Sequence, residues 1–155
     1  MKEFDTIGLM FAKQQASLFE ASTSLDCSSS MFIKKYVFSS WARMFDEYEM
    51  VNYIFSTPMV LEEFKAQIDN KSIGKEKYPR EVLYWIGYIY RFWAYTYELS
   101  TKQVYKIVKP EELKKVYIAY HSLDPRLAIQ RILESKGMKI EDNNTKAKEI
   151  LKGIK

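Results

Sequence analysis

The feature that most constrains the fold of this chain is the stretch YWIGYIYRFWAYTY at residues 84–97. It carries eight aromatic side chains in fourteen positions. At helical spacing these rings occupy every side of one helix, which we expect to run from about residue 80 to residue 99. A helix that is apolar all round lies either in the centre of a soluble core or in a membrane.

The membrane alternative does not fit this stretch. A transmembrane helix needs about 20 predominantly apolar residues, whereas Arg91 lies near the middle and Arg80, Glu81 and Glu98 lie near the ends. Five tyrosine hydroxyls would also lack partners in hydrocarbon. In a soluble core, eight aromatic side chains would remove on the order of 1,200–2,000 Å² from water. We therefore predict a central core helix and no membrane partner.

The remainder of the chain also predicts helices. Apolar residues recur at helical spacing over residues 2–22 and 31–50, the latter interrupted by Ser39-Ser40. Three shorter helices are expected after residue 99: Ser100 with Gln103 forms a capping box for the first, Pro110 begins the second, and Asp124 with Pro125 begins the third. Only five glycines and four prolines occur, which argues against a turn-rich β-protein. We predict an all-α, single-domain bundle of six to eight helices over residues 1–136, followed by a polar tail or marginal helix at 137–155.

Charge is divided unevenly along the chain. Residues 1–70 contain six Lys and Arg against ten Asp and Glu, a net of −4, whereas residues 71–155 contain eighteen against ten, a net of +8. The basic half permits an anionic partner, whether nucleic acid or an acidic protein face. Cys27 is the one cysteine, so no internal disulfide is possible. Because the N-terminus also lacks a secretory signal pattern, we expect a cytoplasmic protein.

The sequence offers little for a metal or a cofactor. A zinc site needs three or four Cys, His or carboxylate ligands, and the chain has one Cys and one His. Neither a G-x-G-x-x-G nor a G-x-x-x-x-G-K phosphate loop occurs. We expect no cofactor and no metal, and we assign no catalytic residue.

Arg91 is the one charge within the aromatic stretch, and its guanidinium cannot lose its proton. One interpretation is a buried clamp to a neighbouring helix, with Asp124 or a helix C-terminus as its partner. The other is an anion pocket in which Tyr88, Tyr95 and His121 orient a ligand, as an uncharacterised enzyme would require. We favour the clamp, because buried charges are usually paired. His121 suits a helix C-terminal cap better than a catalytic base.

Residues 101–118 have the dimensions of a helix-turn-helix. Two short helices are joined at Pro110, and the second carries Lys114 and Lys115, which could contact DNA phosphates. The junction lacks the glycine usual in such turns. A DNA-binding transcriptional regulator is therefore an alternative function rather than our first choice.

Residues 28–133 resemble a family of small bacterial proteins. The stretch YWIGYIYRFW matches their YWIGYxYRxW pattern, and HSLDPRLAI matches H-x-L-D-P-x-x-A-I. SSSMFIKKYVFSS is similar to their upstream S-x-x-F-I-x-x-F-x-x-S segment. Members are often encoded beside proteins resembling ADP-ribosyltransferase toxins. The resemblance therefore implies a role in a toxin–antitoxin system.

From the residues and this resemblance we expect a non-enzymatic protein that binds and neutralises a small protein toxin. The mechanism would be occlusion, in which the C-terminal helices cover the substrate site of the toxin. The expected contacts are exposed basic or aromatic residues of those helices: Lys102, Lys106, Lys114, Lys115, Tyr120 and Arg126. DNA binding through residues 101–118 and an enzyme with an anion pocket at Arg91 stay as the alternatives.

Overall fold

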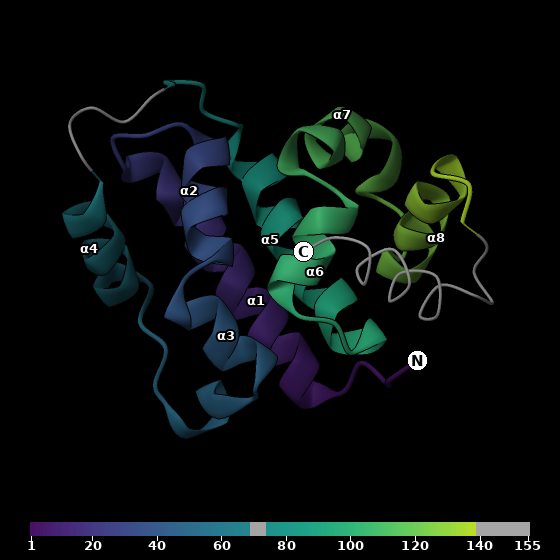
Figure 1. Cartoon of the computed structure of the whole chain (residues 1–155), viewed down its shortest axis with the longest axis horizontal. Coiled ribbons are helices and arrows are strands. Elements are labelled where there is room, and N and C mark those ends of the chain that lie inside the picture. Colours follow the sequence, from purple (N-terminus) through teal and green to yellow (C-terminus); the bar gives the residue numbers. More distant parts are fainter. Residues whose placement is uncertain (69–73, 139–155) are drawn as a thin grey trace.

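The computed structural model describes residues 1–68 and 74–138, and in these ranges the chain forms eight α-helices and no strand (Figure 1). The helices are α1 (Thr6–Ala21), α2 (Ser29–Val37), α3 (Ser40–Asp46), α4 (Thr57–Gln67), α5 (Arg80–Tyr97), α6 (Thr101–Ile107), α7 (Pro110–Tyr120) and α8 (Pro125–Ser135). Short 3-10 helices follow α1 at Ser22–Ser24 and α3 at Glu49–Asn52. The predicted all-α, single-domain fold is confirmed. The tail predicted at 137–155 lies outside the described residues from position 139 onward.

Helices α1 and α5 form an antiparallel pair through the centre of the molecule. Near one end the Lys2 N–H donates to the Thr96 carbonyl at 2.7 Å, and further along Gln15 Nε2 donates to the Gly87 carbonyl at 2.8 Å. A Cβ at Gly87 would lie 2.9 Å from Cα of Ala16, closer than real contacts allow. Glycine at this position therefore permits the close approach of the two helices.

Helix α5 is the predicted aromatic core helix. Thirteen of its eighteen residues are buried. In Figure 1, α2, α3 and α4 lie on one side of the central pair, and α6, α7 and α8 lie on the other. The helix ends at Tyr97, before the predicted residue 99, because Glu98 adopts a left-handed conformation with φ of 54°. None of the described helices is long and apolar enough to cross a membrane.

The later helices begin at the predicted capping residues. Ser100 Oγ accepts from the Gln103 N–H at 3.1 Å, and the Gln103 side chain accepts from the Ser100 N–H at 2.9 Å. This is the predicted capping box, which satisfies two backbone amides of the first turn. Asp124 caps α8 through a single bond, in which its side chain accepts from the Arg126 N–H at 2.8 Å.

The first helix begins later than its apolar periodicity indicates. We expected it from about Lys2, but α1 starts at Thr6. The reason is local, since the side chain of Asp5 accepts from the Gly8 N–H at 3.0 Å and caps the helix there. Residues 1–4 are thereby free to pack across the end of α5.

Candidate functional site

Arg91 lies at the centre of a buried hydrogen-bond network, with 1% of its surface exposed. Its Nη1 donates to Asp46 Oδ1 at 2.7 Å, and its Nη2 donates to Thr101 Oγ1 at 2.6 Å. Nε and Nη2 both donate to Gln15 Oε1, at 3.1 and 2.9 Å, and this oxygen also accepts from the Tyr36 hydroxyl. We call these five side chains the Arg91 network. It joins α1, α2, α3, α5 and α6, so the clamp interpretation of Arg91 is confirmed.

Of the two partners that we predicted for Arg91, Asp124 is wrong. Asp124 is exposed, caps α8 and lies 3.8 Å from Arg126. The actual partner is Asp46, 45 positions earlier in the sequence. Its carboxylate also accepts from the backbone N–H of Thr101 at 3.0 Å and from the Thr101 hydroxyl at 2.7 Å. Asp46 therefore neutralises the guanidinium and caps the first turn of α6.

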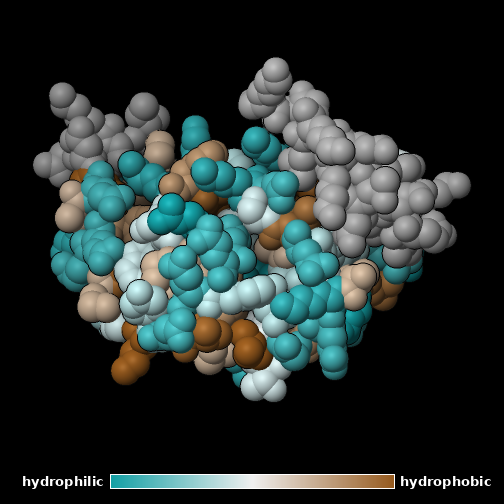
Figure 2. All heavy atoms as spheres, turned by 60° about the horizontal axis from the view of Figure 1, so that its bottom comes forward, coloured by the Kyte–Doolittle hydropathy of each residue, from teal (hydrophilic) through white to brown (hydrophobic). Residues whose placement is uncertain are grey.

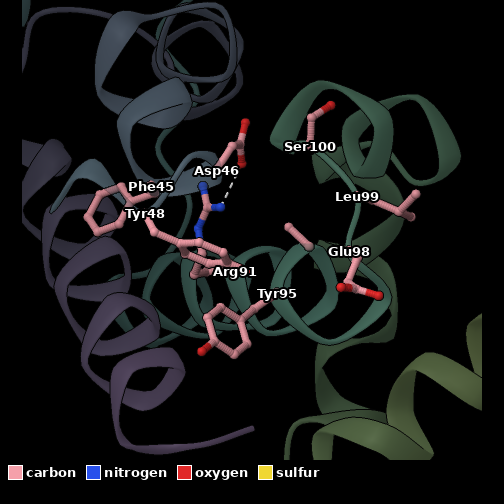
Figure 3. A pocket seen from close by; sticks show the side chains of 9 residues that line it. Phe45, Asp46, Tyr48, Arg91, Tyr95, Glu98, Leu99 and Ser100 are labelled. Atoms are coloured by element: carbon pink, nitrogen blue, oxygen red, sulfur yellow. Dashed lines mark hydrogen bonds and ion pairs between the residues drawn. The ribbon is translucent and has the colours of Figure 1, made fainter. Parts of the chain in front are cut away.

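A pocket of about 200 Å³ lies beside this ion pair (Figure 3). Its walls come from the end of α3, the last turns of α5 and the residues just before α6. In Figure 3 the guanidinium of Arg91 points toward Asp46. Four of the five N–H donors of the guanidinium are already used within the Arg91 network. Because its charge is also paired, Arg91 is poorly suited to hold an anion in this pocket.

Two residues that line the pocket have unusual backbone conformations. Tyr48 and Glu98 have φ of 59° and 54°, and within residues 1–68 and 74–138 they are the non-glycine residues with positive φ. Such conformations cost of order 1–3 kcal/mol and are often found at functional sites. Here each of them turns the chain after a helix, since Glu98 directly follows α5 and Tyr48 follows Glu47, the C-cap of α3. The turns account for both conformations.

The N-terminal segment packs against Tyr48 and Tyr95, two residues that line the pocket. Lys2 Nζ donates to the Tyr48 hydroxyl at 2.7 Å and lies 4.1 and 4.2 Å from the ring centres of Tyr48 and Tyr95. The Tyr95 hydroxyl donates to Asp5 Oδ1 at 2.6 Å.

Hydrogen bonds set the protonation states of this segment. The bond to Tyr48 raises the pKa of Lys2, and the bond from Tyr95 lowers the pKa of Asp5. Burial, followed by the bond to Asp5, raises the pKa of Tyr95. At neutral pH these three groups therefore hold fixed protonation states, which suits a structural contact better than proton transfer.

The residues predicted to share an anion pocket are divided between two places. Arg91 and Tyr95 line the pocket of Figure 3, but Tyr88 and His121 line a separate groove between α5 and α7. The structure thus does not assemble the predicted pocket. His121 instead ends α7, with Nδ1 2.7 Å from the Tyr117 carbonyl, and is the C-terminal cap that we predicted.

The six predicted partner contacts lie on α6, α7 and α8. Lys102, Lys106, Lys115 and Arg126 are exposed, and Lys114 and Tyr120 are half-buried. Lys114 is already paired with Glu76 at 2.8 Å, and Tyr120 packs against the core. Their role in binding stays a prediction.

The predicted helix-turn-helix element forms two separate helices, α6 and α7. The first turn of α7 presents Glu111 and Glu112 to solvent. In a helix-turn-helix protein the N-terminal end of the second helix enters the major groove. The carboxylate of Glu111 at that end would be repelled by DNA phosphates, whereas Glu112 is already paired with Lys136 at 2.7 Å, so the geometry still disfavours DNA recognition through α7.

Several exposed apolar side chains lie close together in sequence between the end of α3 and the first turn of α4, where our sequence analysis assigned no function. We define the apolar surface as Tyr48, Val51, Tyr53, Ile54 and Met59. Ile54 is 93% exposed. Figure 2, which brings the lower side of Figure 1 forward, shows hydrophobic residues gathered along its lower margin.

The apolar surface rests on a small packed cluster of aromatic residues. Phe45 packs against Phe55 with ring centres 5.6 Å apart, and Phe11 of α1 stacks on Tyr48 at 6.1 Å. Met50 is buried in the same cluster. The segment is thus anchored from below while its other side chains face solvent. Its sequence signal is a run of apolar residues without helical or strand periodicity.

Comparison with protein-family models, with curated proteins and with solved structures gives no match to this chain. Among the described residues, no group of three or more His, Cys, Asp or Glu side chains is placed to hold a metal ion. Cys27 is buried, and burial raises the pKa of its thiol. A raised pKa disfavours the reactive thiolate.

Proposed function

We propose that the protein is a non-enzymatic cytoplasmic component of a toxin–antitoxin system that binds and neutralises a small protein toxin. The observation that carries the proposal is the apolar surface, on which Tyr53, Ile54 and Met59 are each more than half exposed. Large apolar side chains grouped on a surface mark a site of interaction with another macromolecule. The toxin as partner is supported by the family resemblance of residues 28–133.

The charges around the apolar surface indicate what kind of protein face would fit it. Glu47, Glu49 and Glu62 are exposed in or beside the segment that carries it. Residues 1–70 as a whole have a net charge of −4, from six basic and ten acidic residues. A complementary partner presents an apolar centre with Lys or Arg at its rim. The toxin would be inactive while this contact covers its substrate site.

This proposal moves the expected contact from the C-terminal helices to the N-terminal half. On α6, α7 and α8 the exposed large apolar side chain is Ile118, and Lys114 and Lys115 precede it by one helical turn. Interfaces derive most of their affinity from a few buried apolar or aromatic anchors, with charged residues mainly at the rim. The lysines of α6 and α7 are therefore weaker candidates than the apolar surface.

The test is co-purification from the native host followed by identification of the bound proteins, with two variants that each carry three substitutions. In the first, Tyr53, Ile54 and Met59 are changed to Ser. In the second, Lys102, Lys106 and Lys115 are changed to Ser. We expect the first variant to bind the toxin at least about tenfold more weakly and the second to bind it normally. The reverse pattern would return the contact to the C-terminal helices.

A nuclease control separates this proposal from the DNA-binding alternative. Complexes are purified with and without nuclease, and DNA affinity is measured over a series of salt concentrations. Toxin retained after nuclease supports the proposal. Affinity for DNA that falls steeply with salt, together with loss of the partner after nuclease, would instead support a transcriptional regulator.

A further inference from the structure

An aromatic groove of about 510 Å³ lies at the other end of the α1–α5 pair from the apolar surface. It opens between the last turn of α1, the first turns of α5 and the end of α7. Four aromatic side chains line it, and two carboxylates stand beside them. The aromatic residues are Tyr84, Trp85, Tyr88 and Tyr117, and the carboxylates are those of Glu20 and Glu81.

The aromatic walls of the groove are held in place by one another. The rings of Trp85 and Tyr117 meet nearly edge to face at 73°, with centres 5.8 Å apart. His121 stacks on Tyr117 at 4.2 Å and 15°, and its Nδ1 lies 2.7 Å from the Tyr117 carbonyl. Packing therefore fixes the orientation of these rings before any ligand binds, and His121 already covers one face of Tyr117.

The electrostatics of the groove select for a cation. Glu20 lies 3.6 Å from Arg80, a pair that is largely exposed. Within the ranges that the structure covers, Glu81 makes no ion pair or hydrogen bond, and its side chain is exposed at the groove. Aromatic faces attract cations through their ring quadrupoles, and the carboxylates add to this attraction. The same charges repel phosphates and other anions.

We propose that this groove binds an arginine side chain on an extended segment of a partner protein. The planar guanidinium stacks against the aromatic walls while it pairs with the carboxylate of Glu81. Arginine suits this geometry better than lysine, because it stacks on rings, is more weakly hydrated and pairs with carboxylates through two parallel bonds. The groove is open, so it cannot bury most of a small ligand, as small-molecule sites do.

The proposal deepens the proposed function and rests on it for the identity of the partner as a protein. The contact is distinct from the apolar surface, because Glu20 lines the groove whereas Phe11 stacks on Tyr48 of the apolar surface, and these two residues of α1 are about 14 Å apart along the helix axis. The arginine contact would therefore add charge selectivity at a second place on the partner.

Short peptides test the groove directly. The full chain is titrated with acetyl-Gly-Arg-Gly-amide and with the same peptide containing citrulline, which keeps the shape of arginine without its charge. Binding is followed by NMR through the indole N–H of Trp85 and the amides around Glu81 and Tyr117. We expect saturable shifts at these positions with the arginine peptide and at least about fivefold weaker binding of the citrulline peptide. Equal binding of both peptides, or shifts confined to other positions, would overturn the proposal.

A pair of charge-matched variants supplies the control. Glu81→Gln should lower the affinity for the arginine peptide by about two- to fivefold. Glu111 is an exposed carboxylate on α7 outside the groove, so Glu111→Gln should leave this affinity unchanged. Equal effects of the two variants would reduce the contact to nonspecific charge attraction and refute the site. Ethylguanidinium, which carries the same planar cation, is the final arm: it should compete with the arginine peptide, and a failure to compete would refute recognition through the guanidinium.

These results are separable from those for the proposed function. The Ser variants of the apolar surface leave the groove intact, and the Glu81→Gln variant leaves the apolar surface intact. Toxin binding without arginine-peptide binding would reject the groove alone. Arginine-peptide binding without toxin binding would reject the identity of the partner and keep the site.

Discussion

The Arg91 network and the apolar surface are two neighbouring regions that reverse the usual placement of side chains. In the first, a charged residue is 1% exposed, and in the second an isoleucine is 93% exposed. They meet at residues 46–48, where Asp46 faces inward to Arg91 and the ring of Tyr48 begins the apolar surface. Buried polar groups and exposed apolar groups are the informative exceptions in a folded protein.

The difference between the two regions is whether the exceptional groups have partners. The guanidinium of Arg91 is paired with Asp46 and bonded to Gln15 and Thr101, so the chain itself compensates its burial. Ile54 and Met59 have large solvent-exposed areas that the described chain does not cover. The first region therefore serves folding, and the second is available for a contact between molecules. The predictions below test that division, from the largest expected effect on stability to the smallest.

Removing the charge at Arg91 should produce the largest loss of folding stability. Arg91→Met leaves Asp46 without its counterion, and breaking a mostly buried pair in this way costs about 3–5 kcal/mol. The free energy of unfolding is measured by urea denaturation. Arg131→Met is the control, because its pair with Glu134 is exposed and its loss should cost less than about 1 kcal/mol. An unchanged stability of Arg91→Met together with lost partner binding would assign Arg91 to function instead.

A substitution at Gly87 tests the close packing of α1 against α5. Gly87→Ala places a Cβ 2.9 Å from Cα of Ala16 and should push α1 and α5 apart. We expect a loss of about 1–3 kcal/mol, as in other overpacked cores, measured by the thermal midpoint and by urea. Ser17→Ala at an exposed position of α1 should have little effect. If both variants melted alike, the contact between α1 and α5 would be looser than the structure indicates.

Alkaline pH should weaken the buried region through its tyrosines. Burial raises the pKa of Tyr78 to about 12 and raises the pKa values of Tyr36 and Tyr90 above the ordinary value of about 10. Because the folded pKa lies above the unfolded one, this contribution to stability is complete below about pH 10 and is lost as the pH rises toward 12.

Melting curves from about pH 8 to about pH 11, with tyrosinate absorbance as a second signal, measure this effect. A midpoint that stays constant above pH 10 would contradict it. Tyr36→Phe, which removes one hydroxyl from the Arg91 network, should reduce the dependence on pH.

The smallest effect on stability should come from the apolar surface. Ile54→Ser should change the free energy of unfolding by less than about 0.5 kcal/mol, as expected for an exposed residue. The matched variant Ile89→Ser, at a fully buried position of α5, should cost more than about 2 kcal/mol. A large loss at Ile54 would show that part of the chain covers this side chain. Light scattering should also show less self-association for Ile54→Ser.

Local features of the sequence were sufficient to predict most of the helices. The aromatic stretch predicted α5 as the core helix, and Ser100, Gln103 and Asp124 predicted where α6 and α8 begin. These inferences succeed because capping and helical periodicity depend on residues within about one turn of each other. The start of α1 was missed by several residues because apolar periodicity does not register the Asp5 cap.

The partners of the functional candidates depended on contacts between distant parts of the chain. The sequence by itself determined that Arg91 would be buried among aromatic rings and would need a partner. Only the tertiary structure decided that Asp46 fills this role, that Tyr88 and His121 lie in a different groove from Arg91, and that residues 48–59 face solvent. Burial depends on the arrangement of whole helices, which a residue's sequence neighbours do not specify. The residue type of Ile54 therefore favours a buried position, whereas the fold places this side chain on the surface.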